Sequence, residues 1–380
     1  MKNGWQTKTF GEILEKTDTI NPLQSPEVEF DYIDVSSVSN QTFRIEETQR
    51  LKGKDAPSRA RRRVRANDIL FATVRPTLQR IAMVPDELDN QVCSTGYFVL
   101  RPKQGIDRRF FFYSLFTEDF MNQMESLQKG ASYPAVTDGE IRAQSLAFPP
   151  LPEQRRIVGI LDEAFDGIAT AKANAEKNLQ NARALFESHL QSVFSRRGVG
   201  WVETTIDRLS INLDSKRVPI TKSDRKSGEY PYYGASGIVD YVADYIFDGD
   251  TLLVSEDGAN LLARSTPIAF SVSGKYWVNN HAHILKFEKM ATQRFVEFYF
   301  ESIKLDEYIT GAAQPKLNQK ALNSIPIPIP ESIDAQANIV DGIESLTTET
   351  QHLATLYQQK LAALDELKKS LLHQAFSGEL

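Results

Sequence analysis

The segment that decides the fold is FPPLPEQRRIVGILDEAFDGIATAKANAEKNLQNARALFESHLQSVFS, residues 148–195. It passes from a proline-rich start into a long stretch without proline, where apolar residues recur at steps of three and four. That spacing is typical of a helix that packs along another helix. A second such segment ends the chain, and its Ile339 follows Ile157 of the first by 182 residues. The two segments therefore predict two long helices with one shared apolar register.

The predicted contacts between these helices come from one stripe on each. They are Ile157, Leu161, Ile168, Leu185, Ile339, Ile343, Leu346, Leu353, Leu364, Leu367 and Leu371. A helix of this length, about 65 Å at 1.5 Å per residue, cannot bury its stripe alone. We expect an antiparallel coiled coil that acts as a spacer. The alternative is that each stripe docks on its own globular part.

Working outward, the rest of the chain is duplicated as well. GW at 4–5 recurs at 200–201, NDILFA (67–72) resembles GDTLLV (249–254) with Asp68 on Asp250, and GASYP (130–134) resembles GAAQP (311–315). Each copy mixes extended segments with few helices. The predicted fold class is α+β, with two duplicated domains separated by the helix pair. The predicted boundaries are 1–150 and 199–330 for the modules, and 151–198 and 331–380 for the helical regions.

Composition limits the functions available. The net charge is −6, but most of the acidic excess lies in residues 331–380, so the overall charge does not exclude a DNA-binding protein. One cysteine excludes an internal disulfide, and five histidines make a structural zinc site improbable. No apolar run is long enough to cross a membrane and the N-terminus lacks a signal-peptide core, so we expect a cytoplasmic location.

The strongest candidate for DNA contact is KGKDAPSRARRRVR, residues 52–65. Its cations are Lys52, Lys54, Arg59, Arg61, Arg62, Arg63 and Arg65, against the single acid Asp55. Arginine can bind guanine edges or phosphates, so we expect this segment to form a DNA-binding loop. A solvated charged loop is the alternative. The counterpart in the second copy has fewer cations, namely Lys216, Arg217, Lys222, Arg225 and Lys226.

Further candidates lie in polar loops at predicted strand ends, where recognition residues are frequent. They are Arg75, Thr77, Ser132 and Tyr133 in the first copy and Asn260, Arg264, Gln314 and Lys316 in the second. Asn279, Asn280 and His281 are also polar enough to contact bases. Turn structure or strand capping explains the loop residues equally well, and a sheet-edge role explains Asn279, Asn280 and His281 at least as well.

No motif for catalysis is present in the sequence. It contains no G-x-x-x-x-G-K-S/T phosphate loop and no Asn/Asp-Pro-Pro-aromatic tetrapeptide of adenine methyltransferases. No nucleophile, base or metal-ligand set has a recognisable spacing. We therefore expect a protein that is not an enzyme and has no metal or cofactor of its own.

The chain resembles the specificity subunits of type I restriction-modification systems. FPPLPEQRRIVGILDEAF (148–165) is similar to the start of a conserved region of that family, and LKKSLLHQAFSGEL (367–380) is similar to its usual ending. The second copy departs from the pattern at IPESIDAQANI (329–339), which leaves the turn geometry there open. The resemblance implies two target-recognition domains that read the two halves of a bipartite site in double-stranded DNA, with the helix pair setting the gap.

The resemblance also implies the partners. Two modification subunits, carrying S-adenosylmethionine and the adenine-N6 chemistry, would dock along the helical regions, and restriction subunits with motor and nuclease activity would join them. Two other classes remain open at this point. A lone methyltransferase or nuclease would need a cofactor or metal motif, and a coiled-coil scaffold would not bind DNA.

Overall fold

The computed structural model describes residues 4–311 and 313–380, so Ala312 of the GAAQP turn lies outside the described residues. The residues form two compact units. One contains residues 1–175 and 359–380, and the other contains residues 176–358. Each unit is a globular module with the parts of the two long helices that pack on it. Among the described residues, no helix is long and apolar enough to cross a membrane.

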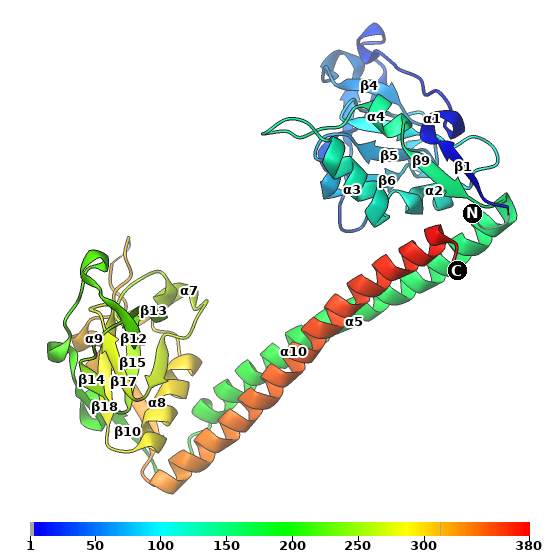
Figure 1. Ribbon diagram of the computed structural model, residues 1–380. Helices are drawn as coiled ribbons and strands as arrows, with labels where there is room; N and C mark the ends of the chain where they lie inside the picture. Colours follow the sequence, from blue (N-terminus) through cyan, green and yellow to red (C-terminus); the bar gives the residue numbers. More distant parts are fainter. Residues whose placement is uncertain (1–3, 312) are drawn as a thin grey trace. The chain divides into compact units, whose positions relative to one another are not determined.

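The described residues of the first module form three sheets and four short α-helices, and its strands and helices are labelled in Figure 1. One sheet has the order β3-β2-β7-β4, another has the order β6-β5-β8, and in the third β1 pairs with β9. Its elements are β1 (Gln6–Thr9), α1 (Phe10–Ile13), β2 (Glu29–Ile33), β3 (Gln49–Lys52), β4 (Ala60–Arg63), β5 (Ile69–Ala72), β6 (Ile81–Met83), β7 (Val92–Ser94), β8 (Tyr97–Leu100), α2 (Arg108–Ser114), α3 (Glu118–Leu127), α4 (Asp138–Arg142) and β9 (Ser145–Phe148).

The second module repeats this topology with one additional strand, β11, beside β18. Its sheets have the orders β13-β12-β17-β14 and β11-β18-β15-β16, and β10 pairs with β19 as β1 pairs with β9. Its elements are β10 (Trp201–Thr205), α6 (Ile206–Leu209), β11 (Ser210–Asn212), β12 (Ser227–Gly234), β13 (Gly237–Val242), β14 (Phe247–Asp248), β15 (Thr251–Ser255), α7 (Asn260–Ala263), β16 (Ala269–Val272), β17 (Lys275–Val278), β18 (Ala282–Phe287), α8 (Met290–Ser302), α9 (Gln319–Ser324) and β19 (Pro326–Pro330).

The central strands are buried on both faces, which explains their continuous apolar runs. Ile69 and Phe71 of β5 face the aromatic residues of α2 and α3, whereas Leu70 and Ala72 face the other way. In β15 it is Leu252 and Val254 that face the helix side. The structural offset in this strand is therefore 183, and Asp68 corresponds to Thr251. The alignment of Asp68 on Asp250 is corrected by one residue, because side chains alternate in a strand.

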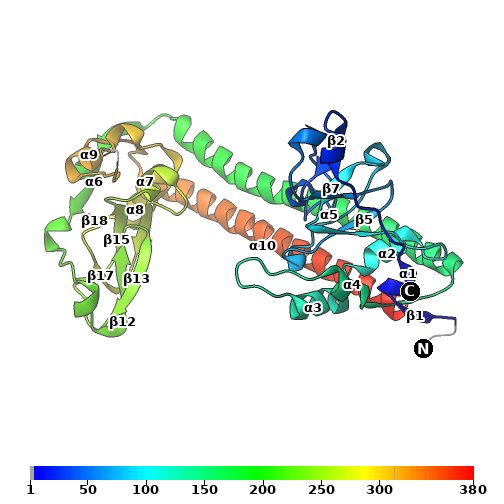
Figure 2. The same cartoon turned by 90° about the horizontal axis from the view of Figure 1, so that it is seen from above.

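The two long helices, α5 (Leu151–Ser195) and α10 (Ile333–Ser377), pair antiparallel, and both views show them side by side (Figures 1 and 2). In the first unit the start of α5 packs with the end of α10, where Leu161 and Leu372 share one core and Lys172 lies 2.7 Å from Asp365. In the second unit Leu190 of α5 packs with Ile343 of α10. The predicted α+β modules and antiparallel helix pair are confirmed.

The contact stripe of the helix pair is partly as predicted. Ile157, Leu161, Ile168 and Ile343 are buried, and Ile339, Leu346, Leu364 and Leu371 are half-buried. Three predicted contacts are wrong, because Leu185, Leu353 and Leu367 are 54%, 39% and 47% exposed.

The stripe runs one residue later at these points. Phe186, Ala354 and Lys368 are half-buried where the neighbouring leucines are exposed. Lys368 stacks its ammonium group over Phe165 at 5.3 Å and Phe43 at 4.9 Å. Hydropathy alone predicts that leucine is buried in preference to alanine or lysine. Lysine can nevertheless take such a position, because its aliphatic stem covers an apolar contact as well as leucine does.

A buried ion pair lies in the interior of the first module. Asp68 and Arg101 are almost fully buried, and the guanidinium donates from Nε to Oδ1 at 2.7 Å and from Nη2 to Oδ2 at 2.6 Å. The backbone N–H of Arg65 supplies a third bond to the carboxylate. In the second module the equivalent residue, Thr251, makes a hydroxyl bond to Tyr276 instead.

We predict that Arg101→Met destabilises the first module by about 3 kcal/mol or more, because it leaves the Asp68 carboxylate buried without its counter-ion. Arg50→Met is the matched control, since Arg50 pairs with Asp31 and Glu29 at the surface and should cost less than about 1 kcal/mol. Urea unfolding of the full chain measures both. Equal costs for the two variants would contradict the prediction.

Candidate nucleic-acid interface

Three segments of the first module meet at one edge of its central sheet. Thr73 donates its N–H to Gly96 O at 2.8 Å and accepts from Val136 N at 2.9 Å, and Arg75 N donates to Pro134 O at 2.7 Å. Thr95 N donates to Arg59 O, which brings the start of β4 to the same place. We call residues 73–80, 94–96 and 128–137 the first loop edge.

The second module has an equivalent edge held by the same three bonds. Glu256 N donates to His281 O at 2.9 Å, Leu317 N donates to Glu256 O at 2.8 Å, and Gly258 N donates to Pro315 O at 3.0 Å. We call residues 255–264, 279–281, 310–311 and 313–317 the second loop edge. The backbone frame is therefore shared by the two modules, while the side chains that it presents differ.

Arg75 and Tyr133 form the most prominent feature of the first loop edge. Tyr133 is 73% exposed, and the Arg75 guanidinium lies 5.3 Å above its ring and donates to Ser132 O at 3.2 Å. Arg75 holds a left-handed backbone with φ of 49°, which is costly for a residue with a side chain. Gly258 takes that position in the second module with φ of 111°. Thr77 is exposed beside this pair.

The basic segment 52–65 differs from the predicted loop. It contains the end of β3, a short 3-10 helix and the whole of β4. Acids from elsewhere neutralise part of it: Glu27 pairs with Lys52 and Lys54, Asp18 with Arg65, and Asp138 with Arg62. The count of one acid, Asp55, was therefore misleading, because the partners lie far away in the sequence.

Three cations of this segment keep their charge available. Arg59 is exposed at the loop edge, and Arg61 and Arg63 are half-buried, with no acidic side chain in contact among residues 4–311 and 313–380. The Nε atom of Arg63 is buried without a hydrogen-bond partner in that described part.

The basic residues of the second module likewise divide into cations held in internal ion pairs and exposed cations. Arg225 pairs with Asp240 at 3.1 Å and stacks on Tyr232, and Arg217 is committed to a buried network. Lys216, Lys222 and Lys226 are exposed. The predicted DNA contacts Arg217 and Arg225 are thus engaged in internal ion pairs, and only the three lysines present free charge in this segment.

Several candidates on the second loop edge have structural roles. Asn260 bonds to Thr266 and Ser265, and Arg264 donates to Phe300 O and Ile303 O. Asn279 is buried and its side chain accepts from His281 N.

The other candidates on that edge are more accessible. His281 bonds to Asp257 at 2.8 Å, whereas Asn280 and Gln314 are exposed. Lys316 is half exposed and lies 3.2 Å from Glu256.

A buried polar network beneath the second loop edge was not found from the sequence. His283 lies 2.5 Å from Asp214 through Nδ1 and 2.7 Å from Leu317 O through Nε2, so both ring nitrogens face acceptors. Arg217 donates to Glu256 at 2.6 Å. Asp214, Glu256 and His283 have a spacing that could hold a metal ion, but Arg217 and Lys316 already pair with Glu256, and the backbone N–H of Ile284 donates to Asp214. The geometry fits an ion-pair network better than a metal site.

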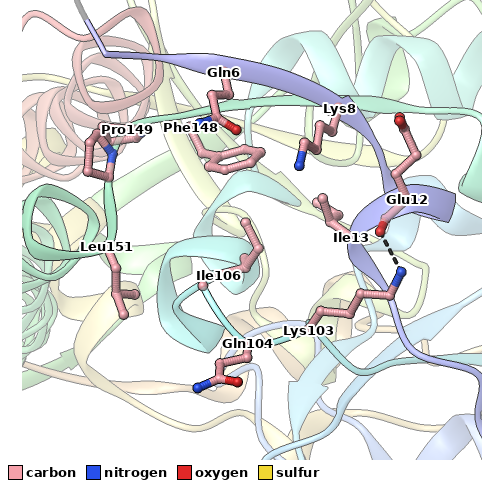
Figure 3. Close-up of a pocket in the computed structure, with 12 residues that line it drawn as sticks. Gln6, Lys8, Glu12, Ile13, Lys103, Gln104, Ile106, Phe148, Pro149 and Leu151 are labelled. Atoms are coloured by element: carbon pink, nitrogen blue, oxygen red, sulfur yellow. Dashed lines mark hydrogen bonds between the residues drawn. The ribbon is translucent and has the colours of Figure 1, made fainter.

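A cavity of about 360 Å³ opens where α5 begins, between β1, β9 and the Lys103–Ile106 turn (Figure 3). Lys103 Nζ donates to Glu12 O at 2.6 Å at its rim, and Phe148 and Ile106 form part of its apolar wall. None of the residues predicted to contact DNA lines this cavity.

The fold places the chain in a class of proteins with two tandem α+β modules and an antiparallel pair of long helices. The family described as the type I restriction modification DNA specificity domain matches residues 2–180 and 199–361. The chain therefore belongs to this family.

A relative in sequence agrees with that assignment. A Haemophilus influenzae protein described as a type I restriction enzyme specificity subunit is 32% identical over 181 residues, covering 43% of this chain and 46% of that protein. The aligned region thus spans less than half of that relative.

Two solved structures share the fold. One is a chain of a type I restriction-modification system, with a TM-score of 0.87 and 23% identity, covering 100% of this chain and 99% of that chain. The other is the HsdS subunit from Thermoanaerobacter tengcongensis, with a TM-score of 0.71 and 24% identity, covering 100% of this chain and 98% of that chain.

The buried network makes the stability of the second module depend on pH. Burial acts to raise the pKa of Asp214 and of Glu256. Burial is the largest single influence on each, but the interactions with His283, the Ile284 N–H and Arg217 together outweigh it at Asp214. Those with Arg217, His283 and Lys316 together outweigh it at Glu256, so both pKa values lie below their ordinary ones. A folded pKa below the unfolded one contributes stability above the unfolded pKa, which is lost as pH falls toward the folded pKa.

We predict that the second module loses stability between about pH 5 and pH 3, and that Glu256→Gln flattens this loss because one of the two titrating carboxylates is gone. Unfolding by urea at a series of pH values measures the slope. Glu229→Gln, a change at an exposed acid of the same module, is the control and should leave the slope unchanged. An identical slope for Glu256→Gln and the native chain would contradict the prediction.

Proposed function

We propose that this chain is the non-catalytic DNA-specificity subunit of a type I restriction-modification complex. The observation that carries the proposal is the pair of loop edges, which share one backbone frame and present different side chains. Such a pair suits the reading of two unlike half-sites in one double-stranded DNA. The family membership and the named function of the relatives support the same conclusion.

The modification subunits would dock along the helix pair. Leu185, Leu353, Leu356 and Leu367 leave apolar surface exposed on the outer sides of α5 and α10. Exposed leucines on a long helix are the usual contact for a partner helix. S-adenosylmethionine and the adenine-N6 chemistry would belong to those subunits, and restriction subunits would add the motor and nuclease. This chain would supply only the recognition of the DNA sequence.

Co-expression with its modification subunit, followed by single-molecule sequencing for N6-methyladenine, tests the proposal. The expected result is one motif of two short half-sites around a fixed gap. A stable complex on DNA with no bipartite motif would contradict the reading of two half-sites. Absence of DNA binding by such a complex would favour the scaffold function.

Arg75 and Tyr133 should read one half-site. We predict that Arg75→Ala and Tyr133→Ala each relax the motif in one half and leave the other half intact, because a bidentate base contact discriminates by about 1–3 kcal/mol. Gln314→Ala, at the equivalent turn of the second module, is the matched variant and should relax only the other half. Methylome sequencing of the three variants gives the answer. Equal loss in both halves would show an effect on folding or assembly instead.

The helix pair should set the gap. We predict that one heptad inserted after Ala175, with a matching heptad after Tyr357, lengthens the gap by about three base pairs, since seven helical residues add about 10 Å. Heptad insertions in both helices preserve the apolar register. The gap in the methylated motif is the measurement, and an unaltered gap would exclude the spacer role.

A further inference from the structure

A second cavity, of about 340 Å³, opens in the first module between β4, α4 and the segment before Ile20. Its wall includes Lys16, Arg61, Arg62, Phe98, Asp138 and Arg142. We call it the arginine cavity. It adjoins the first loop edge, because Thr95 and Asp138 line it and flank Gly96 and Thr137 in that edge.

A β-bulge builds one wall of this cavity. The pairing of β4 with β7 shifts between Ala60 and Arg62, so one extra residue stands on β4. A bulge disturbs the alternation of side chains, and here the consecutive Arg61 and Arg62 both line the cavity. The opposite wall is Arg142 at the end of α4, whose guanidinium lies 5.0 Å above the Phe98 ring.

The charges in the arginine cavity are not balanced. Asp138 is held by Arg62 in a two-pronged ion pair at 2.8 and 3.2 Å, and Asp18 is held by Arg65. Lys16, Arg61 and Arg142 have no acidic partner within the part of the chain that the structure describes. Arg61 and Arg142 are half-buried, and removing a guanidinium from water without an anion is unfavourable. The site therefore favours a negatively charged ligand.

The second module shows what a closed version of this site looks like. His283 occupies the sheet position of Phe98, since His283 lies opposite Val254 as Phe98 lies opposite Phe71. Around it, two carboxylates satisfy Arg217 and Lys316. The strand equivalent to β4 is β14, which carries Phe247 and Asp248 in place of arginines. The second module therefore lacks the arginines of β4 that line the cavity of the first.

We propose that the arginine cavity binds a phosphate group, supplied either by the DNA backbone or by a free nucleotide. Guanidinium groups bind phosphate oxygens with paired N–H donors, and Arg61 and Arg142 have such donors unused. The hydroxyls of Thr17 and Thr95 line the same space and can donate to the remaining oxygens. The DNA source rests on the proposed function. It would anchor the first module on the strand beside the half-site that its loop edge reads.

The first experiment titrates inorganic phosphate, and then adenosine monophosphate, into the full chain at constant ionic strength by calorimetry. Arg142→Gln and Arg61→Gln should each weaken phosphate binding by about tenfold. The Arg61 guanidinium makes its one hydrogen bond within the described part of the chain to its neighbour Ala60 O, so Arg61→Gln keeps the test valid if Arg142→Gln fails to fold. Arg108→Gln, an exposed arginine of the same module outside the cavity, is the control and should bind as the native chain does.

The second experiment measures the salt dependence of duplex binding by the same proteins in complex with the modification subunit. A DNA source predicts that each cavity variant lowers the slope of log K against log salt by about one, while the motif stays the same. A nucleotide source predicts tighter binding of adenosine monophosphate than of phosphate, lost in both variants, with an unchanged slope.

If both variants bind phosphate and nucleotide as the native chain does and leave the slope unchanged, the proposal is overturned. The two conclusions can fail separately. Phosphate binding lost in the variants of a chain that makes no sequence-specific complex supports the cavity and contradicts the specificity function. If the complex gives an intact bipartite motif while the cavity variants bind phosphate, nucleotide and duplex DNA as the native chain does, the specificity function is supported and the cavity proposal is contradicted.

Discussion

One buried glutamine in each half of the chain joins a module to its long helix. Gln154 donates from Nε2 to Pro149 O at 2.8 Å and Gly105 O at 3.1 Å, and its Oε1 accepts from Asp107 N at 2.8 Å. Gln336 donates to Pro330 O at 2.7 Å and accepts from Thr292 Oγ1 at 2.6 Å. Both side chains are almost fully buried. Each bond fixes the start of the helix to the module it leaves, and a lost partner there would leave buried polar groups unsatisfied at about 1–3 kcal/mol each.

The direction of each helix depends on that anchor, and the antiparallel contact depends on the direction. The departure from the family pattern at IPESIDAQANI changes the residues at the turn and keeps the anchor. Pro150 O accepts the first helical N–H groups of α5, and Ser332 caps α10 through its hydroxyl and its carbonyl. The two ends differ chemically because a proline and a serine satisfy the same unpaired helix donors in different ways.

Once the helices are placed, each module is free to differ in its polar centre without losing the fold. The first module buries Asp68 with Arg101 and leaves a positive cavity between Arg61 and Arg142. The second replaces the ion pair with a hydroxyl contact between Thr251 and Tyr276, and closes its centre with Asp214, Glu256, Arg217 and His283. The apolar layers around these centres are shared. Divergence at the loop edges on a constant apolar frame is what a reader of two different half-sites requires.

The sequence alone determined the duplication, the two long helices, the α+β class and the family, because these follow from apolar spacing and from order along the chain. It did not determine which cations are free. Arg62 and Arg65 pair with acids 76 and 47 residues away, and Arg217 pairs with Glu256, 39 residues away, as well as with the nearby Asp214. The distant partners are brought close only by folding. Nor could the sequence show which of two adjacent stripes of α10 is buried. Leu353 is more hydrophobic than Ala354, yet Leu353 is exposed and Ala354 is half-buried. Local pattern specifies elements, whereas charge compensation and contact depend on the distances that tertiary packing sets.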